Sequence, residues 1–379
     1  MITTHVMGGF GNQLFQIFNL ISYCLTNKIP FYFEYKELPD RSDRPFYWDN
    51  FLVSLKPFVK KKYNENMPIY RETGFHYNKI TEYSQINNPF KFFGYFQSYK
   101  YFEEKKDDIF RFIKLQNQKQ TIKDKYKDSY HFDNTISLHF RIGDYKNIQE
   151  HHPIIDSEYY ISALKYIIKK TKKDNWNILY FYEEQDVTQV NSNINEIKSS
   201  FPNNNLNFIP VNTNIQDYEQ VILMSLCMHN IIANSSFSWW GAYFNSNSDK
   251  IVCYPNPDKW FGPAQGNKNM NDMFPTTWIN VSKIINENVF DINKKYSMLI
   301  LSNSFHSKNK SGLEKMLSDL GWKYKYGDIN EIDSFDIIFS PCHPVDTSQY
   351  PTKIFIFGPH FSVFPNTNIL SRINNINNN

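Results

Sequence analysis

Three short segments of this 379-residue chain combine glycine, arginine and hydroxyl side chains in patterns suited to binding an anion. They are residues 8–13, 139–145 and 234–241. Glycine lets the backbone approach a ligand closely, arginine offers a planar fork to phosphate oxygens, and the free N–H groups at a helix start attract negative charge. Together these residue types predict the recognition of a phosphate group.

Residues 234–241 read Asn-Ser-Ser-Phe-Ser-Trp-Trp-Gly and follow the apolar residues 231–233. This order predicts that a short buried strand passes into a helix at the run. In an open α/β sheet such a crevice is where ligands bind, and the hydroxyls suit a phosphate. The alternative is a serine that caps the helix, followed by two packing tryptophans, and the run alone does not separate the two. The candidate ligand contacts are Asn234, Ser235, Ser236 and Ser238.

The first 25 residues predict a strand, a glycine-rich turn and a helix. Residues 3–6 read as the strand, residues 8–13 as the turn, and apolar residues recur at helical spacing over 14–25. The glycine spacing matches neither the dinucleotide fingerprint nor the P-loop, and a plain tight turn also explains it. The candidate contacts here are Gly9, Gly11, Asn12 and Gln13.

The third segment is an apolar strand, predicted at 136–140, that ends in charged residues. Arg141 stands at the strand end, where its guanidinium can form two parallel hydrogen bonds to a phosphate. Asp144 could orient that arginine, accept a proton from a substrate hydroxyl, or form an ion pair. His139 lies within the strand, where a histidine is more often a core residue than a catalyst. These three residues are our catalytic candidates.

The elements around these segments predict an α/β fold with a doubly wound parallel sheet, because strands alternate with helices. Residues 1–130 are predicted to form an N-terminal lobe that carries the glycine turn and an aromatic-rich stretch. Residues 131–295 are predicted to form a second lobe, which carries the other two segments. The predicted strands of that lobe lie at 136–140, 177–182, 208–209, 230–233 and 250–254, and its predicted helices include 157–168 and 218–228.

The chain resembles the α-1,2-fucosyltransferases of glycosyltransferase family 11 over roughly residues 1–290. The resemblance is carried by Gly-Gly-Phe-Gly-Asn-Gln-Leu-Phe-Gln from Gly8, His-Phe-Arg-Ile-Gly-Asp-Tyr from His139 and the run from Asn234, in this order. It implies a two-lobed, GT-B-like fold and a metal-independent, inverting transfer of L-fucose from GDP-fucose to a hydroxyl, usually the 2-OH of a galactose. By this resemblance Arg141 clamps the β-phosphate, and Asp217 is a further nucleotide contact. The resemblance also implies that residues 131–295 are the nucleotide-sugar-binding lobe and that residues 1–130 lie on the acceptor side.

One segment departs from the family. Relatives tend to show Ser-Asp-Asp after the strand at 177–182, whereas this chain has Tyr-Glu-Glu-Gln-Asp at 182–186. If the acidic pair of the family contacts a substrate, that geometry differs here. Two alternatives therefore stay open: a transferase for another nucleotide sugar, and a catalytically inactive sugar- or nucleotide-binding protein of the same fold.

The reaction itself leaves negative charge on the departing diphosphate, which a site must neutralise with a metal, an arginine or a helix start. The sequence shows no His, Cys, Asp and Glu pattern with metal-ligand spacing. We therefore expect no cofactor, and expect Arg141 and backbone amides to act instead. The expected partners are a GDP-sugar donor and a galactose-containing glycan acceptor.

Composition limits the other classes of function. The net charge of +3 is too small and dispersed for a nucleic-acid partner. The sequence shows no signal peptide and no apolar window long enough for a transmembrane segment, which predicts a cytoplasmic protein of bacterial or viral type and leaves a peripheral membrane association open.

The C-terminal segment, residues 296–379, restarts an α/β pattern. Strands are predicted at 298–301, 335–339 and 353–357, with a helix at 313–320. The segment is too short for a complete lobe. We predict that residues 1–295 fold and bind GDP without it.

Overall fold

The computed structural model describes residues 1–39, 44–64, 66–266 and 268–282, and from the C-terminal segment residues 297–301, 318, 323–327, 337–340 and 354–357. The chain divides into two compact units, 1–282 and 283–379, which are described separately. The predicted boundary at residue 295 lies outside the described residues.

A six-stranded sheet organises the larger unit, with the strand order β11-β10-β9-β6-β7-β8 and every pairing parallel. The chain enters at the centre of the sheet with β6, builds outward to β8, and returns to add β9 on the other side of β6. This confirms the predicted α/β class with a doubly wound parallel sheet. The strands are β6 (Thr135–His139), β7 (Asn175–Phe181), β8 (Asn205–Pro210), β9 (His229–Ile231), β10 (Val252–Tyr254) and β11 (Ile279–Asn280).

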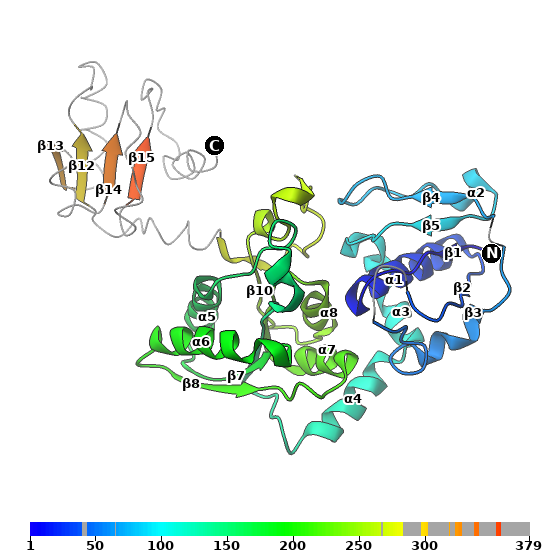
Figure 1. The fold of residues 1–379 in the computed structure, drawn as a ribbon, viewed down its shortest axis with the longest axis horizontal. Coiled ribbons are helices and arrows are strands. Elements are labelled where there is room, and N and C mark those ends of the chain that lie inside the picture. Colours follow the sequence, from blue (N-terminus) through cyan, green and yellow to red (C-terminus); the bar gives the residue numbers. More distant parts are fainter. Residues whose placement is uncertain are drawn as a thin grey trace. The chain divides into compact units, whose positions relative to one another are not determined.

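Helices connect these strands and cover the sheet (Figure 1). The helices α5 and α6 pack on each other, as do α7 and α8. Since parallel crossovers are right-handed, the reversal of winding at β6 puts these two pairs on opposite faces. The carboxylate of Asp156 accepts the Tyr159 N–H at 3.2 Å and so caps α5 at its predicted start. The helices are α5 (Ser157–Thr171), α6 (Val187–Ser199), α7 (Asp217–Leu226) and α8 (Ser236–Phe244).

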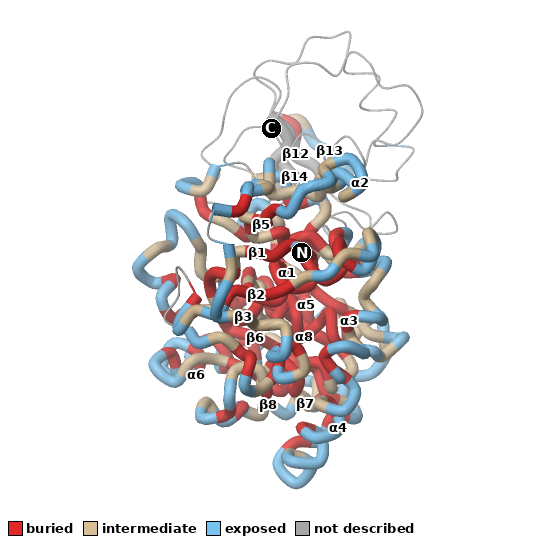
Figure 2. Tube along the Cα trace, turned by 90° about the vertical axis from the view of Figure 1, so that its right-hand side faces the viewer, coloured by how far each residue is buried: buried red, intermediate tan, exposed pale blue. Residues whose placement is uncertain are grey.

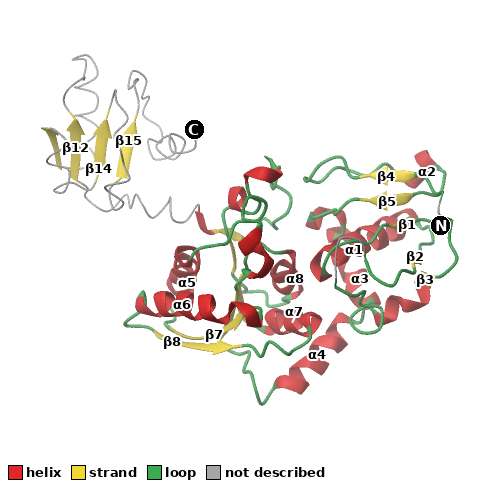
Figure 3. Ribbon diagram, in the orientation of Figure 1, coloured by secondary structure: helices red, strands yellow, loops and turns green. Residues whose placement is uncertain are grey.

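The N-terminal part of this unit has a second parallel sheet, in the order β1-β5-β4. An isolated parallel bridge between Ile2 and Phe31 links this sheet to the segment that leads into the strand pair β2-β3. Figure 3 shows the helices α1 and α3 beside these strands. The arrangement is consistent with a GT-B-like glycosyltransferase. The elements are β1 (Thr3–Thr4), α1 (Phe10–Asn27), β2 (Phe33–Glu34), β3 (Val59–Lys60), β4 (Ile69–Arg71), α2 (Tyr83–Ile86), β5 (Lys91–Phe93), α3 (Lys106–Phe112) and α4 (Leu115–Tyr126).

The start of α1 differs from the prediction. The expected turn over 8–13 is shorter, because the helix begins at Phe10 with Gly9 as its N-cap. Gly11, Asn12 and Gln13 therefore belong to the first helical turn. Glycine disfavours a helix interior, and the tertiary contacts that α1 makes with α8 override that preference.

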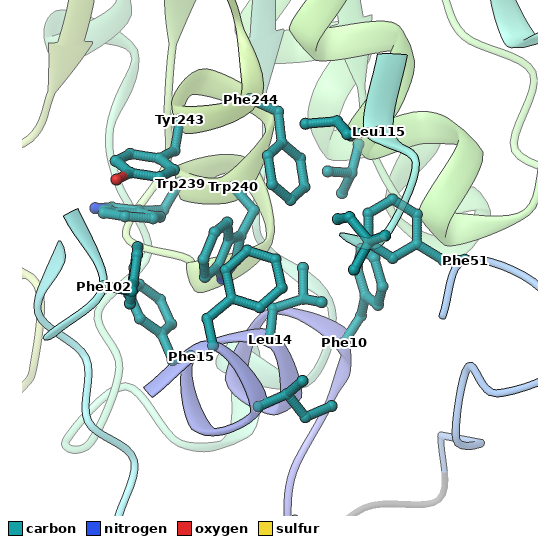
Figure 4. Close-up of a cluster of buried hydrophobic side chains, with 14 of the residues drawn as sticks. Phe10, Leu14, Phe15, Phe51, Phe102, Leu115, Trp239, Trp240, Tyr243 and Phe244 are labelled. Atoms are coloured by element: carbon teal, nitrogen blue, oxygen red, sulfur yellow. The ribbon is translucent and has the colours of Figure 1, made fainter. Parts of the chain in front are cut away.

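An aromatic core joins α1 to α8 (Figure 4). The indoles of Trp239 and Trp240 are fully buried, and Phe15 lies 4.6 and 4.8 Å from them between ring centroids. The Trp240 Nε1–H also donates to the Gly11 carbonyl at 2.8 Å. Deleting such a side chain costs on the order of 3–5 kcal/mol. Figure 2 shows buried residues concentrated where α1 and α8 lie. The six-stranded sheet and the N-terminal three-stranded sheet thus share one core.

The smaller unit contains a four-stranded parallel sheet in the order β13-β12-β14-β15. Three of its strands fall where the sequence predicted them, and β13 was not predicted. The predicted helix at 313–320 lies outside the described residues except for Ser318. The strands are β12 (Ser297–Leu301), β13 (Lys323–Gly327), β14 (Ile337–Ser340) and β15 (Ile354–Phe357).

Candidate active site at the switch point of the sheet

The reversal of strand order between β6 and β9 marks a specific place on the six-stranded sheet. The chain leaves these neighbouring strands in opposite directions, and open α/β sheets bind ligands in the crevice outside the carboxyl ends of such strands. Arg141 follows β6, and the run from Asn234 to Ser238 follows β9. Two of the three sequence motifs therefore lie together at the position where open α/β sheets bind ligands.

The third motif reaches the same place through α1. A Cβ atom at Gly11 would lie 2.6 Å from the carbonyl carbon of Ser236, so the starts of α1 and α8 touch main chain to main chain. The Asn12 Oδ1 accepts hydrogen bonds from the Ser236 hydroxyl at 2.9 Å and from the Gln97 Nε2 at 2.6 Å. The N-termini of the two helices thus converge, and helix N-termini favour anions.

The glycine turn before α1 is fixed by glutamine side chains and has open space at Gly9. The Gln13 Nε2 donates to the carbonyl oxygens of Gly8 at 3.0 Å and Pro45 at 3.1 Å. The Gln16 amide both donates to and accepts from the main chain of Met7. Gly9, in contrast, has no atom within 4 Å of the position of a Cβ. Gln13 is fully buried and shapes the turn, whereas Gly9 leaves room for a ligand at the helix start.

Arg141 lies in a network of charged and aromatic groups. Its Nη1 donates to Glu183 and its Nη2 to Asp144, and its guanidinium carbon stands 4.8 Å above the centre of the Tyr145 ring. The Arg141 side chain is 20 % exposed, whereas that of Asp144 is 62 % exposed. The guanidinium is therefore fixed in place at the crevice, with one exposed carboxylate beside it.

The loop after Arg141 has its own support. Gly143 adopts a φ of 28°, and its N–H donates to the Asp186 carboxylate at 2.6 Å. Lys146 pairs with the same carboxylate at 2.7 Å. Asp186 is 1 % exposed and both its oxygens are engaged, so it anchors the loop that carries Asp144 and Tyr145.

His139 is buried in the last position of β6, and its ring lies 5.5 Å from that of Phe237. Burial, reinforced by the nearby charge of Arg141, lowers the pKa of His139 to about 3. The imidazole is therefore neutral at ordinary pH. This placement favours the core interpretation, and a catalytic role for His139 stays a prediction.

The structure shows the capping and packing interpretation of the hydroxyl run. The Ser235 hydroxyl caps α8 by accepting the Phe237 N–H at 3.3 Å. Ser238 is 1 % exposed and donates to the Ser235 carbonyl at 3.4 Å. Asn234 is also buried, and its Nδ2 donates to the Pro153 carbonyl at 2.8 Å. Ser236 is the partly exposed member and donates to Asn12. Direct ligand contacts by all four residues remain predictions.

Asp217 lies at the start of α7, which follows the edge strand β8 rather than β6 or β9. Its carboxylate accepts a hydrogen bond from the Tyr47 hydroxyl, and the Tyr47 ring packs 4.4 Å from Phe10, the first residue of α1. Asp217 therefore connects the N-terminal part of the unit to α7. Its nucleotide contact also remains a prediction.

No sequence motif pointed to Arg44, Glu183 and Asp186 as parts of this site. The signal for the two acidic residues was the departure from the family at 182–186. Arg44 lies outside every motif, and its Nη2 reaches the Glu183 Oε1 at 3.3 Å. In the portions of the chain that the structure describes, no three His, Cys, Asp or Glu side chains gather in a group suited to a metal ion.

Comparison with known protein sequences places the part of the chain that carries this site in a family. The sequence profile described as Glycosyl transferase family 11 matches residues 1–282, which is the whole of the larger unit. The chain belongs to glycosyltransferase family 11. The expected family is thereby confirmed, and the match includes all three motifs.

Two Escherichia coli relatives of this family 11 chain are similar to parts of it. An O-antigen biosynthesis glycosyltransferase, WbnK, is 36 % identical over 153 residues, which is 39 % of this chain and 45 % of the relative. An alpha-1,2-colitosyltransferase is 31 % identical over 213 residues, or 53 % of this chain and 68 % of the relative. The matched part therefore spans less than half of the first relative's length. In addition, no helix among the described residues is long and apolar enough to cross a membrane.

Proposed function

We propose that this protein is an inverting glycosyltransferase that moves L-fucose from GDP-fucose to a hydroxyl of a glycan, the 2-OH of a galactose being the favoured acceptor. The observation that supports this most directly is the position of Arg141 at the switch point of the sheet, beside the converging starts of α1 and α8. One guanidinium and two helix N-termini around one crevice are suited to a nucleotide diphosphate.

The proposed chemistry follows from the charge of the leaving group. As the bond between the sugar and the diphosphate breaks, negative charge develops on the departing oxygen. Arg141 is held in position by its bond to Asp144 and by the Tyr145 ring, so little reorganisation is needed when that charge appears. The amides at the starts of α1 and α8 add fixed positive potential. No metal is required in this proposal.

The acceptor hydroxyl needs a group that takes or orients its proton. Asp144 is our candidate, because its carboxylate is the exposed partner of Arg141. The substitution Asp144→Asn separates two roles. Loss of kcat together with loss of the acidic limb of the pH–rate profile supports a base, whereas an increased KM for the donor alone supports an orienting role.

Relatives support a second candidate donor. The alpha-1,2-colitosyltransferase is 31 % identical and this chain matches 68 % of its length, so transfer of colitose through the same type of linkage is the alternative. The name of WbnK likewise makes an O-antigen glycan a plausible class of acceptor for the chain. A binding protein that has lost turnover is the non-enzymatic alternative.

One experiment distinguishes these possibilities. Thermal unfolding is measured with GDP-fucose, with the nucleotide sugar of colitose, and with UDP-glucose as an unrelated donor. A bound donor raises the unfolding midpoint by mass action. A shift with GDP-fucose, followed by GDP release once a galactoside is added, supports the proposal. A shift without GDP release from any acceptor supports the inactive alternative, and absence of a shift with both deoxysugar donors contradicts the proposal.

A further inference from the structure

Two arginines from distant parts of the chain meet on one carboxylate oxygen. The Oε1 atom of Glu183 accepts hydrogen bonds from the Nη1 of Arg141 and, at 3.3 Å, from the Nη2 of Arg44. Arg141 follows β6 in the six-stranded sheet, whereas Arg44 lies in the loop before Tyr47 in the N-terminal part of the unit. Two guanidinium groups therefore converge on a single anionic atom at the edge of the crevice.

The position of Arg44 is coupled to the glycine turn. The carbonyl of the next residue, Pro45, accepts the Gln13 Nε2 at 3.1 Å, and the same Nε2 donates to the Gly8 carbonyl at 3.0 Å. Arg44 is thus adjacent in sequence to a residue fastened to the start of α1. Through Gln13, the loop that carries Arg44 is therefore linked to the glycine turn that has open space at Gly9.

Glu183 fits closely into this place. Its Oε2 atom accepts the Gln185 Nε2 at 2.9 Å, and a Cβ at Gly143 would lie 2.7 Å from the same oxygen. The side chain is nevertheless 34 % exposed, and that of Arg44 is 50 % exposed, so a soluble anion can reach the contact. A carboxylate and a phosphate offer similar oxygen pairs to a guanidinium fork.

We infer that Glu183 occupies the place of the donor β-phosphate in the unliganded protein, and that Arg44 and Arg141 together clamp that phosphate once Glu183 has turned away. This inference rests on the proposed function. Arg44 then becomes a donor-binding residue supplied by the N-terminal part of the unit. Glu183 becomes a built-in competitor that neutralises both arginines while the site is empty.

The experiment measures the dissociation constants of GDP and GMP by calorimetry, since only GDP carries a β-phosphate. Arg44→Ala removes one of the two arginines of the clamp. We expect the dissociation constant of GDP to rise about tenfold, the size of one charge-assisted contact, and that of GMP to stay unchanged. Glu183→Gln removes the competing charge at constant shape, and we expect GDP to bind about two- to fivefold more tightly, the size of a partly exposed ion pair.

Arg111→Ala is the matched control, because Arg111 is an exposed arginine whose ion pair with Asp108 lies on α3. It should change neither dissociation constant. Equal weakening of GDP and GMP by Arg44→Ala, or weaker GDP binding by Glu183→Gln, would overturn the inference. If Arg44→Ala does not fold, Arg44→Lys serves the same purpose, since it keeps the charge but loses the planar fork.

The arginine clamp and the proposed function can be disproved separately. If Arg141→Ala loses GDP while Arg44→Ala keeps the wild-type ratio of GDP to GMP affinity, the clamp is wrong and the proposed function stands. If the wild-type protein binds neither GDP nor GDP-fucose, both the proposed function and the clamp are wrong.

Discussion

Gly11 and Ser236 touch main chain to main chain, although 224 residues separate Asn12 from its hydroxyl partner on Ser236. A Cβ at position 11 would lie 2.6 Å from both the carbonyl carbon and the carbonyl oxygen of Ser236. Real side chains do not tolerate such distances to a backbone, so the contact holds only with glycine at this position. It fixes how closely the starts of α1 and α8 approach.

Gly11→Ala should therefore disturb both stability and nucleotide binding. We expect a loss of about 1–3 kcal/mol in the free energy of unfolding, as for overpacking of a tight interior, measured by urea denaturation. Gly9→Ala is the matched comparison, because its Cβ would meet no atom within 4 Å and its φ is −74°. That variant should keep wild-type stability and lose GDP affinity. Wild-type stability in Gly11→Ala would contradict the described contact.

Replacement of Arg141 tests the phosphate position. Arg141→Ala should lower kcat/KM. We expect the loss of transition-state stabilisation to be roughly 3 kcal/mol or more, the size expected for a lost oxyanion donor. Arg141→Lys should recover little of this, because lysine lacks the two-pronged geometry. Steady-state kinetics with circular dichroism as a folding control give the answer. A kcat/KM close to wild type in the alanine variant would remove the diphosphate from this part of the sheet.

The lowered pKa of the buried His139 side chain predicts a loss of stability in acid. Its pKa is lowered by burial to about 3, from an ordinary value of 6.5, so below pH 6.5 the unfolded chain binds a proton that the folded chain does not. Stability should fall as the pH is lowered through this window, by about 1.4 kcal/mol per pH unit for this group. His229, with a pKa lowered to about 4, adds to the effect.

The substitution His139→Gln should remove the contribution of His139 and flatten the dependence of unfolding free energy on pH between about 4.5 and 6. Urea denaturation at several pH values measures the slope. His151→Gln provides the control, since His151 is exposed in the folded chain. An unchanged slope in His139→Gln would show that the ring is protonated within the fold.

Chelation tests how the leaving-group charge is neutralised. If Arg141 and the helix starts carry that charge, transfer activity should survive excess EDTA. GDP release is followed before and after chelation, and after addition of Mg²⁺ or Mn²⁺. Complete inhibition that a divalent ion reverses would mean that a metal replaces part of the proposed role of Arg141.

Truncation tests the organisation of the chain. Residues 1–295 include the whole of the larger compact unit and the entire family match, so we expect this fragment to be soluble and to bind GDP as the full chain does. Calorimetry on both proteins makes the comparison. Aggregation of the fragment, or a soluble fragment without GDP affinity, would show that residues 296–379 are required by the transferase.

Two of the motifs meet for a physical reason. Arg141 and Ser235 each follow a strand of one parallel sheet, and the carboxyl ends of such strands lie at one edge. Strand positions could be recognised from short apolar runs, and the order of the motifs along the chain matched a known family. The position of the crevice therefore followed from local patterns.

The pairing of Arg44 with Glu183 could not be predicted in the same way. Exposed charged residues follow no periodic pattern, and their partners depend on which loops the completed fold brings together. The start of α1 at Phe10 was missed because Gly11 weakens the local helical signal, while the contact that favours the helix comes from Trp240, far along the chain. Local sequence carries neither interaction.

The bond from Trp240 to the Gly11 carbonyl also has a consequence for how the protein is made. It spans 229 residues, so a ribosome must release nearly all of the larger unit before α1 can meet α8. Contacts this distant form late, because the intervening chain must be ordered first. A nascent or prematurely terminated chain that lacks α8 cannot assemble the crevice. The first motif to be synthesised therefore becomes functional only after the last one has folded against it.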